Sequence, residues 1–77
     1  MSYSLGILKY QGKRIYDLAN DSMDNHKIFD ESCNTILDWT PWYMPEYCDI
    51  RDNSEVAVDE VSEEEATEIF KKLKELI

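Results

Sequence analysis

The sequence predicts an α+β fold in which two helices pack on one face of an antiparallel sheet, approximately in the order ββαββα, with residues 1–77 as a single domain. Two observations support this fold class. Short β-rich runs bounded by turn residues occur in both halves of the chain. Two other segments carry apolar residues at helical spacing. The core must be thin, because a domain of this size buries only roughly 60% of the surface of its unfolded chain.

The first expected element is a β-hairpin. The runs YSLGILKY and RIYDL have the β-branched and aromatic content of strands, and residues 11–13 between them form a loop of hairpin length. Gly12 is available for the positive φ that a tight hairpin turn needs. The polar segment 19–25 that follows is typical of a connection, because Asn and Asp side chains favour turns.

The second expected element is a helix of about three turns that ends near Trp39. Pro41 disfavours helical geometry at Thr40, which sets this end. His26 would then be a surface residue near the helix start. The stripe at helical spacing consists of Ile28, Phe29, Ser32, Cys33, Ile36 and Leu37.

A second hairpin is expected after the segment 40–47, which contains two prolines and is predicted to be neither a helix nor an ordinary strand. The runs YCDI and EVAV flank turn residues 51–54. Val56 and Val58 would share one face of the last strand. The opposite, outward face would hold Glu55, Ala57 and Asp59.

The last expected element is a helix that begins after Ser62. Ser62 and Glu65 have the spacing of a capping box, and acids at 63–65 with lysines toward the end complement the helix macrodipole. The apolar face of this helix would consist of Ala66, Ile69, Phe70, Leu73 and Leu76.

Negative charge is concentrated in one segment. Residues 1–45 hold six acids and four bases, residues 46–68 hold ten acids and one base, and residues 69–77 hold one acid and three bases, giving −2, −9 and +2. A surface of this sign repels nucleic acid and attracts a basic protein surface. We therefore expect no direct nucleic-acid binding. The competing interpretation is that the acids serve solubility and protect an exposed sheet edge.

The stretch TPWYMPEY places much aromatic surface between two prolines. Trp and Tyr are enriched at binding hot spots, and the fixed φ of each proline stiffens the segment. The alternative is that the segment folds back as a lid over a thin core, and the two roles can coexist. The residues predicted to bind a partner are Trp39, Trp42, Tyr43, Tyr47, Asp49, Asp52, Glu55, Asp59 and Glu60.

No catalytic residue, cofactor or metal site is expected. Glycine occurs only at positions 6 and 12, so a phosphate-cradling loop is excluded. His26 is the only histidine, and on the expected helix it lies too far from Cys33 to form a thiolate–imidazole pair. The spacings of zinc sites are missing, and Arg51 and Ser54 stand where a calcium loop needs a ligand and a glycine.

These features favour a small acidic, non-enzymatic protein-binding module. We expect an inhibitor or regulator that covers a basic surface of a partner protein, including the kind of surface that otherwise binds nucleic acid. Small acidic proteins without enzyme motifs are familiar among the inhibitors of phages and mobile elements, which favours the same hypothesis. The alternative is a self-associating homodimer, because association is one remedy for a thin core.

The compartment follows from two further observations. The N-terminus lacks the basic and apolar regions of a secretory leader, and no segment approaches the roughly 20 apolar residues that span a bilayer. We therefore expect a cytoplasmic protein with no membrane partner, in which Cys33 and Cys48 are reduced.

Overall fold

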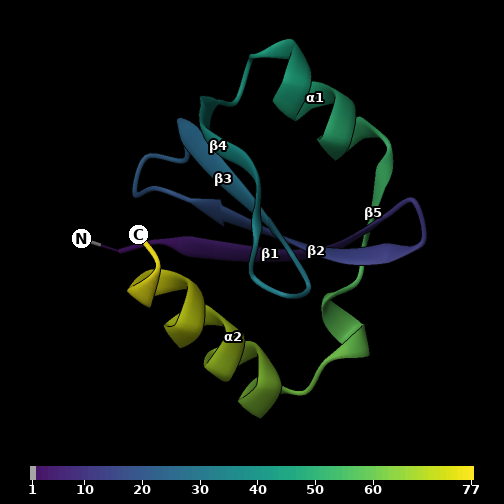
Figure 1. The fold of residues 1–77 in the computed structure, drawn as a ribbon, viewed down its shortest axis with the longest axis vertical. Coiled ribbons are helices and arrows are strands. Elements are labelled where there is room, and N and C mark those ends of the chain that lie inside the picture. Colours follow the sequence, from purple (N-terminus) through teal and green to yellow (C-terminus); the bar gives the residue numbers. More distant parts are fainter. Residues whose placement is uncertain (1) are drawn as a thin grey trace.

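The computed structural model describes residues 2–77 and consists of one antiparallel sheet and two helices (Figure 1). The elements in chain order are β1 (Ser4–Tyr10), β2 (Lys13–Ala19), β3 (Asn25–Asp30), β4 (Thr35–Pro41), α1 (Pro45–Asp52), β5 (Ser54–Val56), the 3₁₀ helix η1 (Val58–Glu60) and α2 (Glu63–Glu75). The strand order is β4-β3-β2-β1-β5. The predicted α+β class is therefore confirmed, whereas several elements differ from the prediction.

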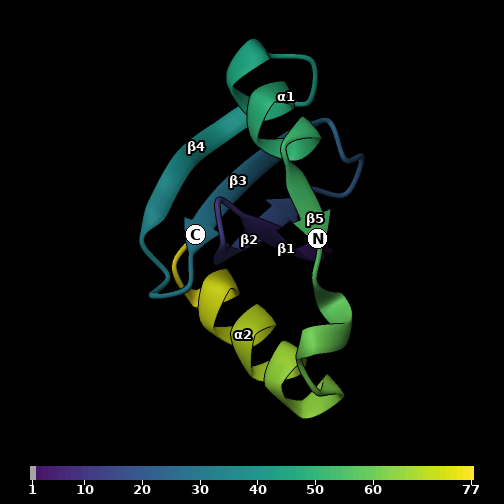
Figure 2. The ribbon, with the colours of Figure 1, turned by 90° about the vertical axis from the view of Figure 1, so that its right-hand side faces the viewer.

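The two helices lie on opposite faces of the sheet, not on one face as predicted (Figure 1 and Figure 2). Successive residues of a strand point to opposite faces, and in β2 both Ile15 and Tyr16 are buried. Ile15 clusters with Tyr47 and Ile50 of α1, whereas Tyr16 clusters with Leu73 of α2. Because the central strands are apolar on both sides, each face requires its own helix.

The predicted first hairpin is confirmed, and its turn is tighter than expected. β1 and β2 pair along their whole lengths, which leaves only Gln11 and Gly12 in the turn. Both residues have positive φ, 53° and 77°, as in a type I′ turn. This turn type has the twist of the strands that it joins, so it supports an uninterrupted pairing.

The prediction of a helix that ends near Trp39 is wrong, because residues 25–41 form the β3–β4 hairpin. Ile28 and Phe29 are neighbours in the chain and are both almost completely buried. A strand between two covering layers accommodates such a pair, since its side chains alternate between the two faces. The apolar spacing that resembles a helix here arises from a strand that is buried on both sides.

Asp30 sets the turn of this hairpin. Its Oδ1 atom accepts the backbone N–H groups of Ser32 and Asn34, each at 2.9 Å. Cys33 has a φ of 66°, which is incompatible with a right-handed helix. The turn chemistry of the run DESCN therefore outweighs the helical spacing of the apolar residues around it.

The predicted second hairpin is also wrong, because its first strand is part of α1. Pro45 lies in the first turn of α1, where its fixed φ and missing N–H fit the helix. Tyr47 and Ile50 are three residues apart and both face the sheet. The prediction paired the last strand with the run YCDI. In the structure β5 instead pairs antiparallel with β1, which is the first strand of the chain.

The last strand differs from the prediction at Val56, Ala57 and Val58, whereas Glu55 and Asp59 are exposed as predicted. Val56 is 77% exposed, whereas Ala57 is 3% exposed and its N–H donates to the Ile7 carbonyl at 2.8 Å. The strand ends at Val56, and η1 carries Val58 and Asp59 on the surface. This change of direction after Val56 breaks the simple alternation on which the prediction depended.

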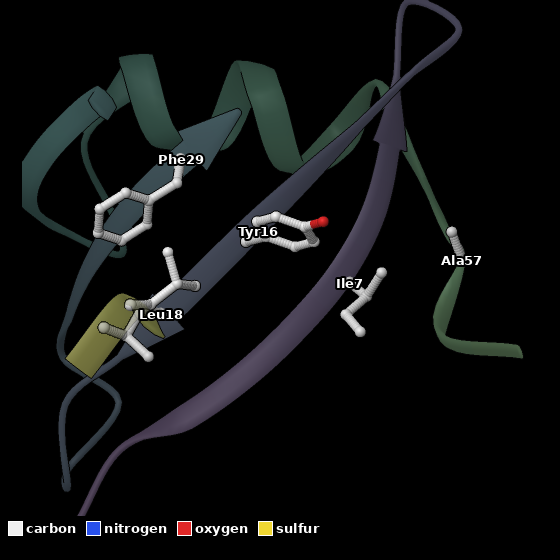
Figure 3. Close-up of a cluster of buried hydrophobic side chains, with 6 residues drawn as sticks. Ile7, Tyr16, Leu18, Phe29 and Ala57 are labelled. Carbon is white, nitrogen blue, oxygen red and sulfur yellow. The ribbon is translucent and has the colours of Figure 1, made fainter. Parts of the chain in front are cut away.

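The predicted last helix is confirmed as α2. The Ser62 hydroxyl caps it by accepting the backbone N–H of Glu65 at 3.1 Å. Leu73 is fully buried, whereas Leu76, which the pattern assigned to the same face, is 52% exposed. Figure 3 shows the sheet-side members of the cluster that includes Leu73: Ile7, Tyr16, Leu18, Phe29 and Ala57.

The edge strand β4 pairs irregularly with β3. Its register with β3 shifts at two places. Asp38 Oδ1 accepts the Trp39 N–H at 2.9 Å, and the Thr40 hydroxyl donates to the Asp38 carbonyl at 2.6 Å. Such irregularities and local hydrogen bonds make an edge a poor template for a further strand.

We expect Gly12→Ala to lower the free energy of unfolding by about 1–2 kcal/mol, because an L side chain disfavours the left-handed region. A Cβ atom at this position would have no heavy atom within 4 Å, so the effect is one of backbone conformation alone. Urea denaturation measures it. Gln11→Asn is the control and should leave stability unchanged or higher, since Asn suits this turn position. Equal stability of wild type and Gly12→Ala would contradict the turn assignment.

The β3–β4 turn should weaken in acid. The backbone N–H of Asn34, helped by that of Ser32, holds the pKa of the Asp30 carboxyl below its ordinary value of 3.8. A pKa that is lower in the folded chain contributes stability above the unfolded value and loses it as the pH falls through the folded value.

Asp30→Asn should accordingly have a lower melting temperature than wild type at pH 7, and this difference should shrink as the pH falls below 3.8 and through the lowered pKa of the wild-type carboxyl. Thermal denaturation of both proteins across this range measures the effect. A difference in melting temperature that does not change with pH would show that the carboxylate charge has no part in the turn.

Candidate functional site

A three-residue loop, Trp42, Tyr43 and Met44, joins β4 to α1 and is called the 42–44 loop below. Trp42 is 51% exposed and Tyr43 is 63% exposed. Of the segment 40–47 predicted to lack regular structure, only these three residues lie outside a strand or helix. Pro41 ends the strand and Pro45 starts the helix, so both neighbours of the loop have a restricted φ.

Backbone contacts hold the 42–44 loop in place. The Trp42 N–H donates to the Asp24 carbonyl at 2.8 Å, which ties the loop to the β2–β3 connection. The Met44 N–H donates to the Pro41 carbonyl at 3.1 Å. The Cys48 thiol lies 3.3 Å from the Trp42 carbonyl and donates to it. The exposed side chains therefore project from a backbone that is fixed at both ends.

The two exposed rings form a perpendicular pair. The centroids of Trp42 and Tyr43 are 5.7 Å apart, and their planes meet at 85°. Trp39 does not belong to this pair. It is 38% exposed on β4, its ring lies 6.2 Å from that of Tyr3, and both rings line a separate hollow of about 440 Å³. The structure thus divides the predicted aromatic group into two places.

Tyr47, which the sequence predicts to contact a partner, is a core residue in the structure. It is 4% exposed, and its hydroxyl donates to Asp17 Oδ2 at 2.6 Å. Burial, reinforced by this hydrogen bond, raises the pKa of the Tyr47 phenol. Tyr47 is buried because it lies on the inner face of α1, whereas Tyr43 lies in the loop before this helix.

Sequence reasoning missed a buried polar cluster of Asp17, His26 and Tyr47. His26 is 6% exposed, not a surface residue as predicted, because it lies on β3 and not at a helix start. Its Nδ1 atom lies 2.8 Å from Asp17 Oδ1, and its ring stacks on Tyr47 with centroids 4.1 Å apart. A signal was present, since Asp17 interrupts the apolar alternation of Ile15 and Ala19 in β2.

The geometry of His26 is that of a structural group. Its Nε2 atom lies 3.1 Å from the Met23 carbonyl oxygen, while Nδ1 faces the Asp17 carboxylate. Both ring nitrogens are therefore engaged, and neither faces a hydroxyl or thiol that it could activate. This cluster joins β2, β3 and α1 and has no arrangement for nucleophilic catalysis.

The acids of α1 line its outer surface. Glu46, Asp49 and Asp52 are exposed, whereas Tyr47 and Ile50 face the sheet. Arg51 Nε lies 3.0 Å from the Asp52 carboxylate, and this pairing raises the pKa of the Arg51 guanidinium. In the described part of the chain Glu46 and Asp49 form no ion pair, so α1 keeps a net negative charge directly after the 42–44 loop.

The other predicted acids lie apart from α1, on β5 and η1. Glu55 is exposed on β5 opposite Lys9 of β1, and Lys9 Nζ lies 3.1 Å from Glu60. Asp59 is exposed on η1. The predicted acidic patch therefore has two parts, and the β5–η1 part is partly neutralised by Lys9.

Residues 2–77 contain no group of three or more His, Cys, Asp or Glu side chains arranged to hold a metal ion. Neither α1 nor α2, the two α-helices of these residues, is long and apolar enough to cross a membrane. A hollow of about 900 Å³ lies beside α2 and has walls of mixed charge that include Arg14, Glu31 and Lys72. None of these features resembles a binding site as closely as the 42–44 loop and the surface of α1.

The chain matches no protein-family model, no curated protein and no solved structure.

Tyr47→Phe should lower the free energy of unfolding by about 1.5–3 kcal/mol, the range for a hydrogen bond to a charged group. The change leaves the ring in the core and removes only the donor to Asp17. Tyr43→Phe is the matched control and should shift stability by less than about 0.5 kcal/mol, because that ring is exposed. Chemical denaturation of the two variants decides the point, and equal effects would contradict the structural role of the Tyr47 hydroxyl.

Proposed function

We propose that this chain is a non-enzymatic protein-binding module that covers a basic surface of a partner protein and thereby inhibits or regulates it. The observation that carries the proposal is the position of the exposed Trp42–Tyr43 pair directly before α1, whose outer surface holds Glu46, Asp49 and Asp52. We call these five residues the acidic aromatic surface. It combines the two properties that favour fast and tight association between proteins.

The aromatic part would supply most of the binding energy. Large rings that bury completely on binding are the usual hot spots of an interface, and Trp and Tyr lead that group. The 42–44 loop is held by hydrogen bonds at both ends, so little conformational entropy remains to be lost when a partner binds. Preorganised rings of this kind favour a low dissociation rate.

The acidic part would select the partner and speed its approach. The formal net charge is −9, and Glu46 and Asp49 carry no internal counter-ion in the described residues. A surface of this sign attracts a basic partner and repels nucleic acid and anionic membranes. Basic protein surfaces commonly serve phosphate binding, so covering one would block it. This is the route by which we propose inhibition.

Self-association through the sheet edges is less well supported. β4 has two register shifts and local side-chain hydrogen bonds along its edge, and β5 has only three residues. Edges of these kinds do not favour pairing with another strand. A second copy would also bring the same negative charge to the interface.

The proposal is tested with two charge variants that remove the same number of acids from opposite sides of the sheet. The first combines Glu46→Gln, Asp49→Asn and Asp52→Asn on α1. The second combines Glu64→Gln, Glu68→Gln and Glu75→Gln on α2, where all three residues are exposed. Tagged wild type and both variants are used to capture proteins from a lysate of the source organism or its host, and mass spectrometry quantifies what remains bound.

We expect a basic protein that is retained by wild type and by the α2 variant but lost with the α1 variant. Its affinity should fall by about tenfold or more between about 0.1 M and about 1 M NaCl, because the Debye length shrinks from about 10 Å to about 3 Å. Equal loss with both variants would mean that only net charge matters. Affinity that is unchanged by salt would contradict the electrostatic part, and circular dichroism confirms that each variant is folded.

A further inference from the structure

The Trp42–Tyr43 pair has the form of a corner with two aromatic walls. The ring planes meet at 85° with centroids 5.7 Å apart, and more than half of each residue is exposed. In such an edge-to-face pair the edge of one ring approaches the face of the other, so the faces of the two rings meet at a right angle. Ring faces carry the negative end of the aromatic quadrupole, so the corner attracts a cation.

Three other aromatic rings of the chain already form cation–π contacts with a Lys or Arg of the same chain. Arg51 lies 5.8 Å from the centroid of Tyr47, and Lys74 lies 4.7 Å from that of Phe70. Lys27 lies in the same way over Phe29. Within residues 2–77 no Lys or Arg lies over Trp42 or Tyr43, although these rings are among the most exposed.

The surroundings of the corner add negative charge. Asp24 is tied to the loop through the bond from the Trp42 N–H to its carbonyl, and its side chain is exposed. Glu46 follows Tyr43 by three residues in the first turn of α1. The corner therefore combines two ring faces with carboxylates on the adjoining segments, and in the described residues no Lys or Arg lies over either ring.

We infer that the Trp42–Tyr43 corner accepts an arginine side chain from the basic partner. This inference rests on the proposed function and names the group that the partner contributes. A planar guanidinium stacks on an aromatic ring and still donates N–H groups in its plane to carboxylates. A lysine ammonium has only a point charge and is more strongly hydrated, so it gains less from the same corner.

The test uses three short peptides as probes, in which glycine alternates with arginine, with lysine or with citrulline. The lysine peptide has the charge of the arginine peptide without its planar group, and the citrulline peptide has nearly the shape of the arginine peptide without its charge. Each is titrated at about 0.1 M NaCl, where exposed charges beyond about 10 Å are screened. Calorimetry gives the affinity, and the NMR signal of the Trp42 indole N–H reports contact at the corner.

Wild type should bind the arginine peptide about fivefold more tightly than the lysine peptide, because the planar guanidinium stacks on a ring and is less strongly hydrated than the ammonium. The citrulline peptide should bind far more weakly than either. Trp42→Leu keeps an apolar side chain without a ring and should abolish the preference for arginine. Trp39→Leu is the control and should retain it, because Trp39 pairs with Tyr3 elsewhere on the surface.

Three results would overturn the inference: equal or tighter binding of the lysine peptide, an arginine preference that survives Trp42→Leu, or undiminished binding of citrulline. If cationic peptides then still require Glu46, Asp49 and Asp52, the acidic part of the proposed function stands without the corner. If neither cationic peptide binds to wild type, both the corner and the proposed function fail. Melting temperatures of the Leu variants verify their folding, since both sites are exposed.

Discussion

The placement of α1 depends on the contacts of the Asp17 carboxylate. The position of the acidic aromatic surface depends on them too, because this surface includes the outer side of α1. Asp17 lies on β2 with its side chain only 12% exposed, and it contacts His26 of β3 and Tyr47 of α1. A buried carboxylate without partners would strongly destabilise the fold. The three groups are therefore interdependent, and together they fix α1 to two central strands. Because the 42–44 loop leads directly into α1, the interior cluster also determines where Trp42 and Tyr43 project.

The arrangement of the helices separates two kinds of surface. On one side of the sheet α2 covers an apolar cluster centred on Leu73 and carries its lysines toward its end. On the other side α1 covers the polar cluster and presents acids outward. The basic residues of α2 therefore do not neutralise the acids of α1.

Local signals in the sequence were sufficient for the elements that local chemistry determines. Gly12 set a hairpin turn, and Ser62 with Glu65 set a helix start. The segment around Ile28 and Phe29 was misassigned, because a strand that is buried on both faces has no alternation, and periodicity cannot then separate it from a helix. The site residues also divide into those that the local sequence indicates and those that only the tertiary fold places. The loop rings and the α1 acids share one region, but only the tertiary fold shows that Tyr47 faces Asp17, since the contact joins residues 17 and 47.

The pairing of β5 with β1 has a consequence for how the chain folds. Strands β1 to β4 form a continuous meander in which each strand pairs with the next one in the sequence, so their contacts close short loops. The contact between Lys9 and Glu55 joins distant parts of the chain, so it has a larger loop-closure entropy cost than the contacts of the meander. During synthesis the outer edge of β1 therefore remains uncovered until the chain has been extended beyond α1. The three residues of β5 then cover this edge of β1 and protect the sheet from pairing with another chain.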